Sequence, residues 1–159
     1  MQTVIVSVIT FVLLAGSTVA AQPEPFSFAG LSLNTTIAEL KRKYPRAMVV
    51  GELVYLTAQE SHDGITTIGL SGTGARRSLT VTFEQRQPGG TNTYPACEKL
   101  VSTLTERYGS PTNVIDAQEE RARNRRFEWK RSTETLTLSC FRISSQPLYA
   151  ERLTMTSDR

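Results

Sequence analysis

Several segments of the chain alternate apolar and polar residues, which is the pattern of half-buried antiparallel strands. In SLTVTFEQ, residues 78–85, Leu79, Val81 and Phe83 share one face. The same alternation recurs later in RRFEWKR, ETLTLSCFR and AERLTMT. RSTE lies between the first two of these later segments and predicts a hairpin connection. The pattern therefore predicts several antiparallel strands, with a further one around NVIDA.

A first helix is predicted from about residue 36 to residue 44. Thr36 is followed three residues later by Glu39, which is a capping-box signature. Leu40 and Tyr44 recur at helical spacing on one face. Pro45 then ends the helix, because proline has no backbone N–H to continue it.

A second helix is predicted in YPACEKLVSTLTERYGSP. Pro95 lies near its start, and Gly109 follows its last apolar residue, as expected at the two ends of a helix. Cys97, Leu104 and Tyr108 share its apolar face. Cys97 therefore lies in the first turn of this predicted helix, facing the core.

The two helical segments resemble each other in sequence. ELKRKYPRA, residues 39–47, aligns with TLTERYGSP, residues 103–111, and Leu40 and Tyr44 fall on Leu104 and Tyr108. Strand-like segments follow both helices, which suggests a duplicated helix-plus-strands unit with halves 31–90 and 91–159. The order helix, strands, helix, strands predicts an α+β fold, in which an antiparallel sheet is covered on one face by two helices.

The first 21 residues have the pattern of a secretory signal peptide. An apolar run from Val4 to Ala15 precedes small residues, and cleavage after Ala21 fits best. The alternative is an uncleaved anchor, although the run is shorter than the ~20 residues that span a bilayer. We therefore expect a periplasmic or secreted protein without a transmembrane segment in the mature chain. It would consist of an extended leader, residues 22–30, and one domain, residues 31–159.

The two cysteines are expected to form a disulfide. An even cysteine count in an exported chain indicates a bridge, and Cys97–Cys140 is the one available. Closing such a loop contributes roughly 4 kcal/mol in the chain-entropy model. The bridge would pin the second helix onto the strand face that carries Leu136 and Leu138. The alternative is two buried free thiols; a metal site is not expected, because one distant histidine completes no ligand set.

Arginines are concentrated in DAQEERARNRRFEWKR. The net charge of the whole chain is only +3. Its most distinctive basic segment is this cluster, which comprises Arg121, Arg123, Arg125 and Arg126. Arginines beside aromatic residues can bind an anionic surface or an acidic protein. In the alternative interpretation, the charges of a solvated hairpin pair with one another, for instance Glu119 with Arg123. Trp129 is expected in the core, and nucleic acid is not an expected ligand outside the cytoplasm.

No catalytic constellation is predicted. SHDG, residues 61–64, brings together a hydroxyl, an imidazole and a carboxylate, but Ser, Asp and Gly are common turn residues, and neighbours in a turn rarely converge as a triad must. GTGARR has glycines without the Lys-Ser/Thr of a phosphate-binding loop and predicts a connection between strands. We expect no cofactor.

A resemblance to known families rests on GLSLNTTIAELKRKYP, in which Gly30 precedes the Thr-capped helix. This unit resembles the helix-entry motif of small bacterial envelope domains of the SmpA/OmlA (BamE-like) type. It is also similar to the duplicated modules of the β-lactamase inhibitory protein family, and LTLSCF resembles one of that family's strands. The chain lacks the lipidated cysteine of the assembly lipoproteins, and both its cysteines lie in its second half. The resemblance implies an exported, non-enzymatic module that acts by protein contact.

The expected function is thus a binding module of the bacterial cell envelope, with an envelope protein or an anionic surface as its partner. An alternative is an inhibitor of an extracytoplasmic enzyme, which would present residues 60–64 or 86–93 to an active site. A small hydrolase acting through carboxylates is the third hypothesis.

Overall fold

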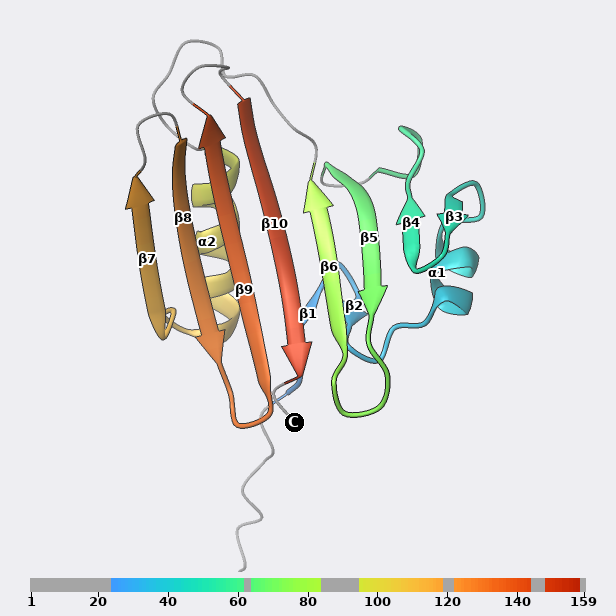
Figure 1. The fold of residues 1–159 in the computed structure, drawn as a ribbon, viewed down its shortest axis with the longest axis horizontal. Helices are drawn as coiled ribbons and strands as arrows, with labels where there is room; N and C mark the ends of the chain where they lie inside the picture. Colours follow the sequence, from blue (N-terminus) through green and yellow to red (C-terminus); the bar gives the residue numbers. More distant parts are fainter. Residues whose placement is uncertain (1–23, 62–63, 84–94, 119–121, 144–147, 158–159) are drawn as a thin grey trace, which may run out of the picture.

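The structure, a computed structural model, describes residues 24–61, 64–83, 95–118, 122–143 and 148–157. These residues form an eight-stranded antiparallel sheet, a separate two-stranded sheet and two helices (Figure 1). Across the large sheet the spatial order is β3 (Met48–Val50), β4 (Leu53–Tyr55), β5 (Ile65–Ser71), β6 (Ser78–Phe83), β10 (Leu148–Ser157), β9 (Glu134–Ile143), β8 (Ala122–Lys130) and β7 (Asn113–Gln118).

The remaining elements lie outside the large sheet. They are β1 (Ser27–Phe28), β2 (Leu31–Ser32), α1 (Ile37–Lys43) and α2 (Pro95–Tyr108). Figure 1 shows α2 behind β8 and β9, α1 beside β3 and β4, and the β1–β2 pair behind β6 and β10. Among the described elements, α2 and the β1–β2 pair therefore lie on the same broad face of the sheet.

The expected α+β fold class is wrong, because the described residues are mostly β. Of these residues, 50% lie in strands and 18% in helices. The predicted helices form, but α1 has only 7 residues, whereas β8, β9 and β10 have 9, 10 and 10. Sheet pairing, which is supplied by contacts between distant segments, gives the strands a larger share of the chain than the α+β prediction of a sheet covered by two helices implied.

The element order is the same in both halves of the described chain. A helix precedes four strands that pair in sequence, first α1 with β3 to β6 and then α2 with β7 to β10. The last strands of the two sets pair antiparallel, with Leu153 opposite Val81. This pairing joins both sets into one sheet. Descent from a duplicated unit stays a prediction.

The hydrophobic core lies on the face of the sheet that the helices cover. It is one cluster, which takes Leu40 from α1, Leu104 from α2 and Leu31 from β2. The strands contribute their alternate residues, including Leu79, Val81, Phe83, Leu136, Leu138, Leu153 and Met155. The period-two patterns in the sequence thus mark this covered face correctly.

The start of α1 has the predicted capping box. The Thr36 hydroxyl accepts from the backbone N–H of Glu39 at 3.2 Å, and the Glu39 carboxylate accepts from the backbone N–H of Thr36 at 2.8 Å. The Thr36 N–H, followed by the Thr36 hydroxyl, lowers the pKa of Glu39. Because these bonds satisfy backbone donors that have no partner within the helix, they fix where α1 begins.

Part of the segment expected as an extended leader is packed against the domain. Phe26 is buried, with its ring edge against Tyr108 at 5.0 Å between centroids. The backbone N–H of Phe26 donates to the Glu134 carboxylate at 3.0 Å, and the N–H of Ser27 donates to the Tyr108 hydroxyl at 2.8 Å. These contacts fasten the β1 segment to the end of α2 and to the β8–β9 hairpin. Residues 1–21, expected as a signal peptide, lie outside the described residues.

Among the described residues, no helix combines the length and the apolar character that crossing a membrane requires.

Candidate functional site

The face of the large sheet opposite the core carries mainly hydroxyl side chains at its centre. Thr80 and Thr154 are neighbours across the β6–β10 pair, and their hydroxyl oxygens are 3.4 Å apart. The same face carries further half-buried Ser and Thr residues, at Thr67, Ser78, Thr82, Thr135, Thr137, Ser139 and Thr156. This central part is polar and needs no cover from another element.

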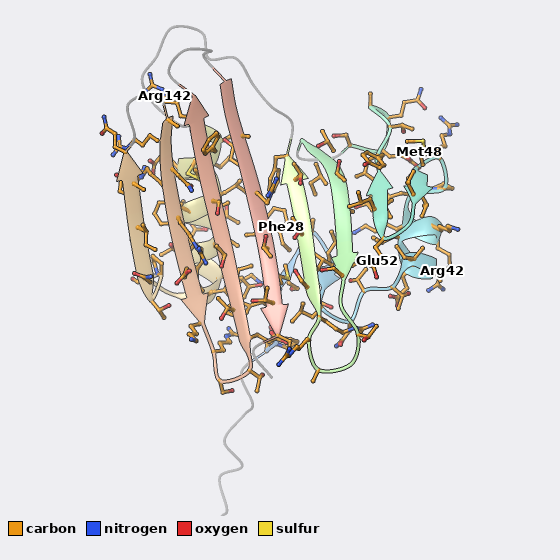
Figure 2. All side chains as sticks on the ribbon, viewed as in Figure 1. Phe28, Arg42, Met48, Glu52 and Arg142 are labelled. Carbon is orange, nitrogen blue, oxygen red and sulfur yellow. A yellow bond between two sulfur atoms is a disulfide. The ribbon has the colours of Figure 1, made fainter. Side chains whose placement is uncertain are left out.

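One end of this open face is apolar instead. Met48, Val50, Leu53 and Tyr55 are 60%, 54%, 41% and 39% exposed. They form two cross-strand pairs between β3 and β4, Met48 with Tyr55 and Val50 with Leu53. We call these four residues the edge patch. Figure 2 shows Met48 at this end of the molecule, close to α1.

The edge patch extends onto the neighbouring strand through a glycine. Leu53 pairs with Gly69 of β5, and a Cβ on Gly69 would lie 3.1 Å from the Leu53 Cδ2 atom. The Leu53 side chain therefore rests on the Gly69 backbone. A larger residue at position 69 would have to displace it.

The local sequence explains why the β3–β4 hairpin forms. Gly51 and Glu52 are the two residues between the paired strands, and Gly51 has a φ of +59°. A two-residue hairpin loop of type II′ needs a positive φ at its first position, which glycine adopts without strain. The turn fixes the register, and the register places Met48, Val50, Leu53 and Tyr55 on one face.

The predicted arginine cluster does not form one surface. Arg123 and Arg125 are on the same side of β8 as Phe127, whereas Arg126 is on the open face of the sheet. Arg121 lies outside the described residues. Alternation along a strand separates these neighbours in the sequence.

The described arginines of this cluster are ion-paired. The Arg123 guanidinium holds the Asp116 carboxylate with two hydrogen bonds, one of them 2.8 Å long. Arg125 pairs with Glu98 of α2 and lies over the Phe127 ring, 5.1 Å from its centroid. On the other face, Arg126 contacts Glu128 at 2.6 Å and Glu128 accepts from Asn113. Arg123 thus pairs with Asp116 in the preceding strand; Glu119, its expected helical partner, lies outside the described residues. A role of these arginines in binding anions stays a prediction.

The Arg123 contact also affects the protonation of Asp116. The hydrogen bond from Arg123 lowers the pKa of Asp116, and the charges of Arg123 and Arg125 lower it further. The carboxylate therefore stays ionised in more acidic solution than an ordinary aspartate does.

The predicted pairing of the cysteines is confirmed. Cys97 and Cys140 form a disulfide with their Cα atoms 5.9 Å apart, and both residues are buried. Trp129 is in the core, as predicted, where its indole N–H donates to the Gly109 carbonyl at 2.8 Å. The disulfide and this hydrogen bond attach the two ends of α2 to the sheet.

The structure gives little support to the remaining functional residues that the sequence suggested. His62 and Asp63 of the SHDG turn lie outside the described residues, as do residues 86–93, so the inhibitor hypothesis built on these loops stays a prediction. Within the ranges that the structure describes, no three His, Cys, Asp or Glu side chains are grouped closely enough to hold a metal ion.

The sequence interpretation missed the edge patch, although the sequence carries a signal for it. MVVGELVY has apolar residues at both alternating positions of each strand, so that Val49 and Val54 can face the core while their neighbours face outward. A strand with two apolar faces indicates a second contact surface.

Comparisons of the chain with protein-family models, with curated proteins and with solved structures give no match. The resemblance to BamE-like and β-lactamase inhibitory domains therefore stays a prediction.

Proposed function

We propose that this chain is an exported, non-enzymatic protein-binding module, and that the edge patch is the centre of its binding surface. The observation that carries the proposal is the exposure of Met48, Val50, Leu53 and Tyr55 side by side on one sheet face. Single exposed apolar residues are normal on a protein surface, but contiguous ones mark interaction sites.

Charged residues of both signs lie around the patch, because exposed Glu52 is in the β3–β4 turn beside it. The last turn of α1, which precedes β3, carries Lys41, Arg42 and Lys43. Figure 2 shows Arg42 on the same side of the molecule as Met48. Opposite charges at the rim of an interface raise the association rate, and they do so less at high salt. A partner with apolar side chains in the centre, carboxylates opposite α1 and a basic group opposite Glu52 would match this end of the sheet.

Export is supported by the pattern of the first 21 residues and by the disulfide, since disulfides persist in oxidising compartments. The intact mass of the protein purified from the cells that encode it tests this part. We expect a chain that begins at Gln22 and takes up no alkylating label until it is reduced. A chain that begins at Met1 with two labelled cysteines would contradict export.

Site-specific crosslinking tests the binding surface. A photoreactive amino acid at Val50, in the edge patch, is compared with the same group at Thr137, on the polar part of the same face. We expect a discrete adduct with one protein from Val50, weak or no adduct from Thr137, and loss of the Val50 adduct when Leu53→Asp is added. Equal crosslinking at both positions, or an adduct that survives Leu53→Asp in a folded chain, would refute the proposed surface.

A further inference from the structure

A shallow pocket lies at one end of the sheet, where the loop between β5 and β6 meets the last residues of β10. Figure 1 shows this loop and the end of β10 side by side at the bottom of the view. The pocket has a volume of about 490 Å³, and no carboxylate is found among its described lining residues. We call it the arginine pocket, because its lining combines two arginines with hydroxyl residues, namely Arg76, Arg77, Ser71, Ser78, Thr156 and Ser157.

The strand register places the hydroxyl groups of the arginine pocket in a row. Ser71 of β5 pairs with Ser78 of β6, and Ser78 pairs with Thr156 of β10. Residues directly opposite one another in an antiparallel sheet share a face, so these three side chains cross the end of the open face. The Thr156 hydroxyl donates to the Thr135 carbonyl at 3.4 Å. Within the described part of the chain, the hydroxyls of Ser71 and Ser78 bond to no other group, and both can donate to a ligand.

The loop that carries the two arginines is fastened on both sides of Arg76. The Ser157 hydroxyl donates to the Ala75 carbonyl at 2.7 Å, and the Ser157 backbone N–H donates to the Arg77 carbonyl at 2.9 Å. The backbone N–H of Arg76 donates to the Thr73 carbonyl at 3.3 Å. Because these bonds already hold the loop backbone, a ligand that binds there has less conformational freedom to remove.

The protein itself does not neutralise these two guanidinium groups. Whereas the described arginines of β8 pair with carboxylates, Arg76 and Arg77 form no ion pair within the described ranges. Arg77 also borders a neighbouring pocket that contains Glu134. The Glu134 carboxylate accepts from the backbone N–H of Phe26. Both arginines can therefore pair with a bound anion.

We propose that the arginine pocket binds a phosphate monoester group. Such a group has a charge of about −1.5 to −2 at pH 7 and three acceptor oxygens. These match the two guanidinium groups and the donor hydroxyls of Ser71 and Ser78. An arginine can hold two phosphate oxygens through parallel N–H···O bonds, which adds geometric specificity to the charge. A carboxylate, with one charge and two oxygens, leaves part of this donor set unused.

This proposal does not rest on the proposed protein-binding function. The edge patch lies on β3 and β4, and the arginine pocket lies on the β5–β6 loop and β10, so the two share no residue. Failure of the phosphate test would leave the crosslinking test at Val50 unaffected, and the reverse also holds.

Three small probes test the class of ligand. Binding of glycerol 3-phosphate, acetate and glycerol to the purified protein is measured by calorimetry at physiological ionic strength. We expect glycerol 3-phosphate to bind at least about tenfold more tightly than acetate, and glycerol not to bind. Equal affinity for glycerol 3-phosphate and acetate, or no binding of glycerol 3-phosphate at millimolar concentration, would overturn the proposal.

Two variants with the same change in net charge assign the binding to the pocket. Arg76→Gln removes an exposed guanidinium from the lining and should weaken glycerol 3-phosphate binding about tenfold. Arg152→Gln, at an exposed position of β10 outside the pocket, is the matched control. Arg152 precedes Thr156 by about 13 Å along the strand, farther than the ~8 Å over which exposed charges interact in physiological salt. Its replacement should leave the affinity unchanged, and equal weakening by both variants would overturn the assignment.

Vesicles distinguish a soluble phosphate monoester from a lipid headgroup. Flotation of the protein is compared between vesicles of phosphatidylcholine alone and vesicles that also contain phosphatidic acid, whose headgroup is a phosphate monoester. Flotation that requires phosphatidic acid and is lost in Arg76→Gln would assign the pocket to a membrane lipid. No flotation, together with binding of glycerol 3-phosphate, would assign it to a soluble ester. Flotation with phosphatidic acid that survives Arg76→Gln would contradict recognition by this pocket.

Discussion

Cys97, in the first turn of α2, is bonded to Cys140, in the middle of β9, across 43 positions of the sequence. Both side chains are buried on the covered face of the sheet. The bond therefore holds the start of α2 against the strand that it covers.

Loss of this disulfide should destabilise the fold. The loop that it closes predicts a loss of roughly 4 kcal/mol in the free energy of unfolding when Cys97 and Cys140 are both replaced by alanine. Urea denaturation of the oxidised chain, the reduced chain and the double variant measures the loss. Reductant should lower the midpoint of the parent chain and leave that of the double variant unchanged. Identical midpoints for the oxidised and reduced parent would contradict this prediction.

Trp129 should stabilise the folded chain through both its hydrogen bond and its buried area. Trp129→Phe removes the indole donor to the Gly109 carbonyl and should cost about 1 kcal/mol or somewhat more. Trp129→Ala should cost about 3–5 kcal/mol, because it also leaves a large cavity. Thermal unfolding monitored by circular dichroism gives both values. Equal losses for the two variants would show that packing around the ring is unimportant.

Replacing either of two glycines in the loop between β5 and β6 by alanine should destabilise the fold, but to different extents. Gly72 has a φ of +81°, and a Cβ there would lie 1.9 Å from the Arg76 carbonyl oxygen. Gly74 has a φ of +59° with open space around it. Gly74→Ala should cost about 1–2 kcal/mol, from backbone strain alone. Gly72→Ala should cost clearly more, since Arg76 must also move. Melting temperatures of the two variants provide the comparison, and a smaller loss for Gly72→Ala would contradict the loop geometry.

The pair of Asp116 and Arg123 should stabilise the fold only when Asp116 is ionised. Its pKa is lowered in the folded chain, so the stabilisation is complete above the usual aspartate value of about 3.9. It is lost as the pH falls below that value towards the lowered pKa. Asp116→Asn should therefore reduce the melting temperature slightly at pH 7, and the difference from the parent should shrink by pH 2.5. A difference that is constant across this range would exclude the ion pair as its cause.

The sequence by itself determined the local elements of this protein. Thr36 and Glu39 marked the start of α1, Gly109 marked the end of α2, and alternation around Leu79 and Leu136 marked the strand faces. These signals are local, because capping bonds and strand alternation involve residues only a few positions apart. The pairing of the cysteines followed from their number, and from the prediction that Cys97 and Cys140 both lie on core-facing sides of their elements.

Tertiary structure decided the fold class and the surfaces. The pairing of β6 with β10, which joins Val81 to Leu153, merges two sets of strands into one sheet, and no local pattern encodes that pairing. The same long-range packing leaves Met48 and Val50 exposed while Val49 turns towards the core. It also brings the end of β10 to the loop that carries Arg76 and Arg77. An apolar residue in a strand can face either the core or a partner, and only the position of the other elements determines which.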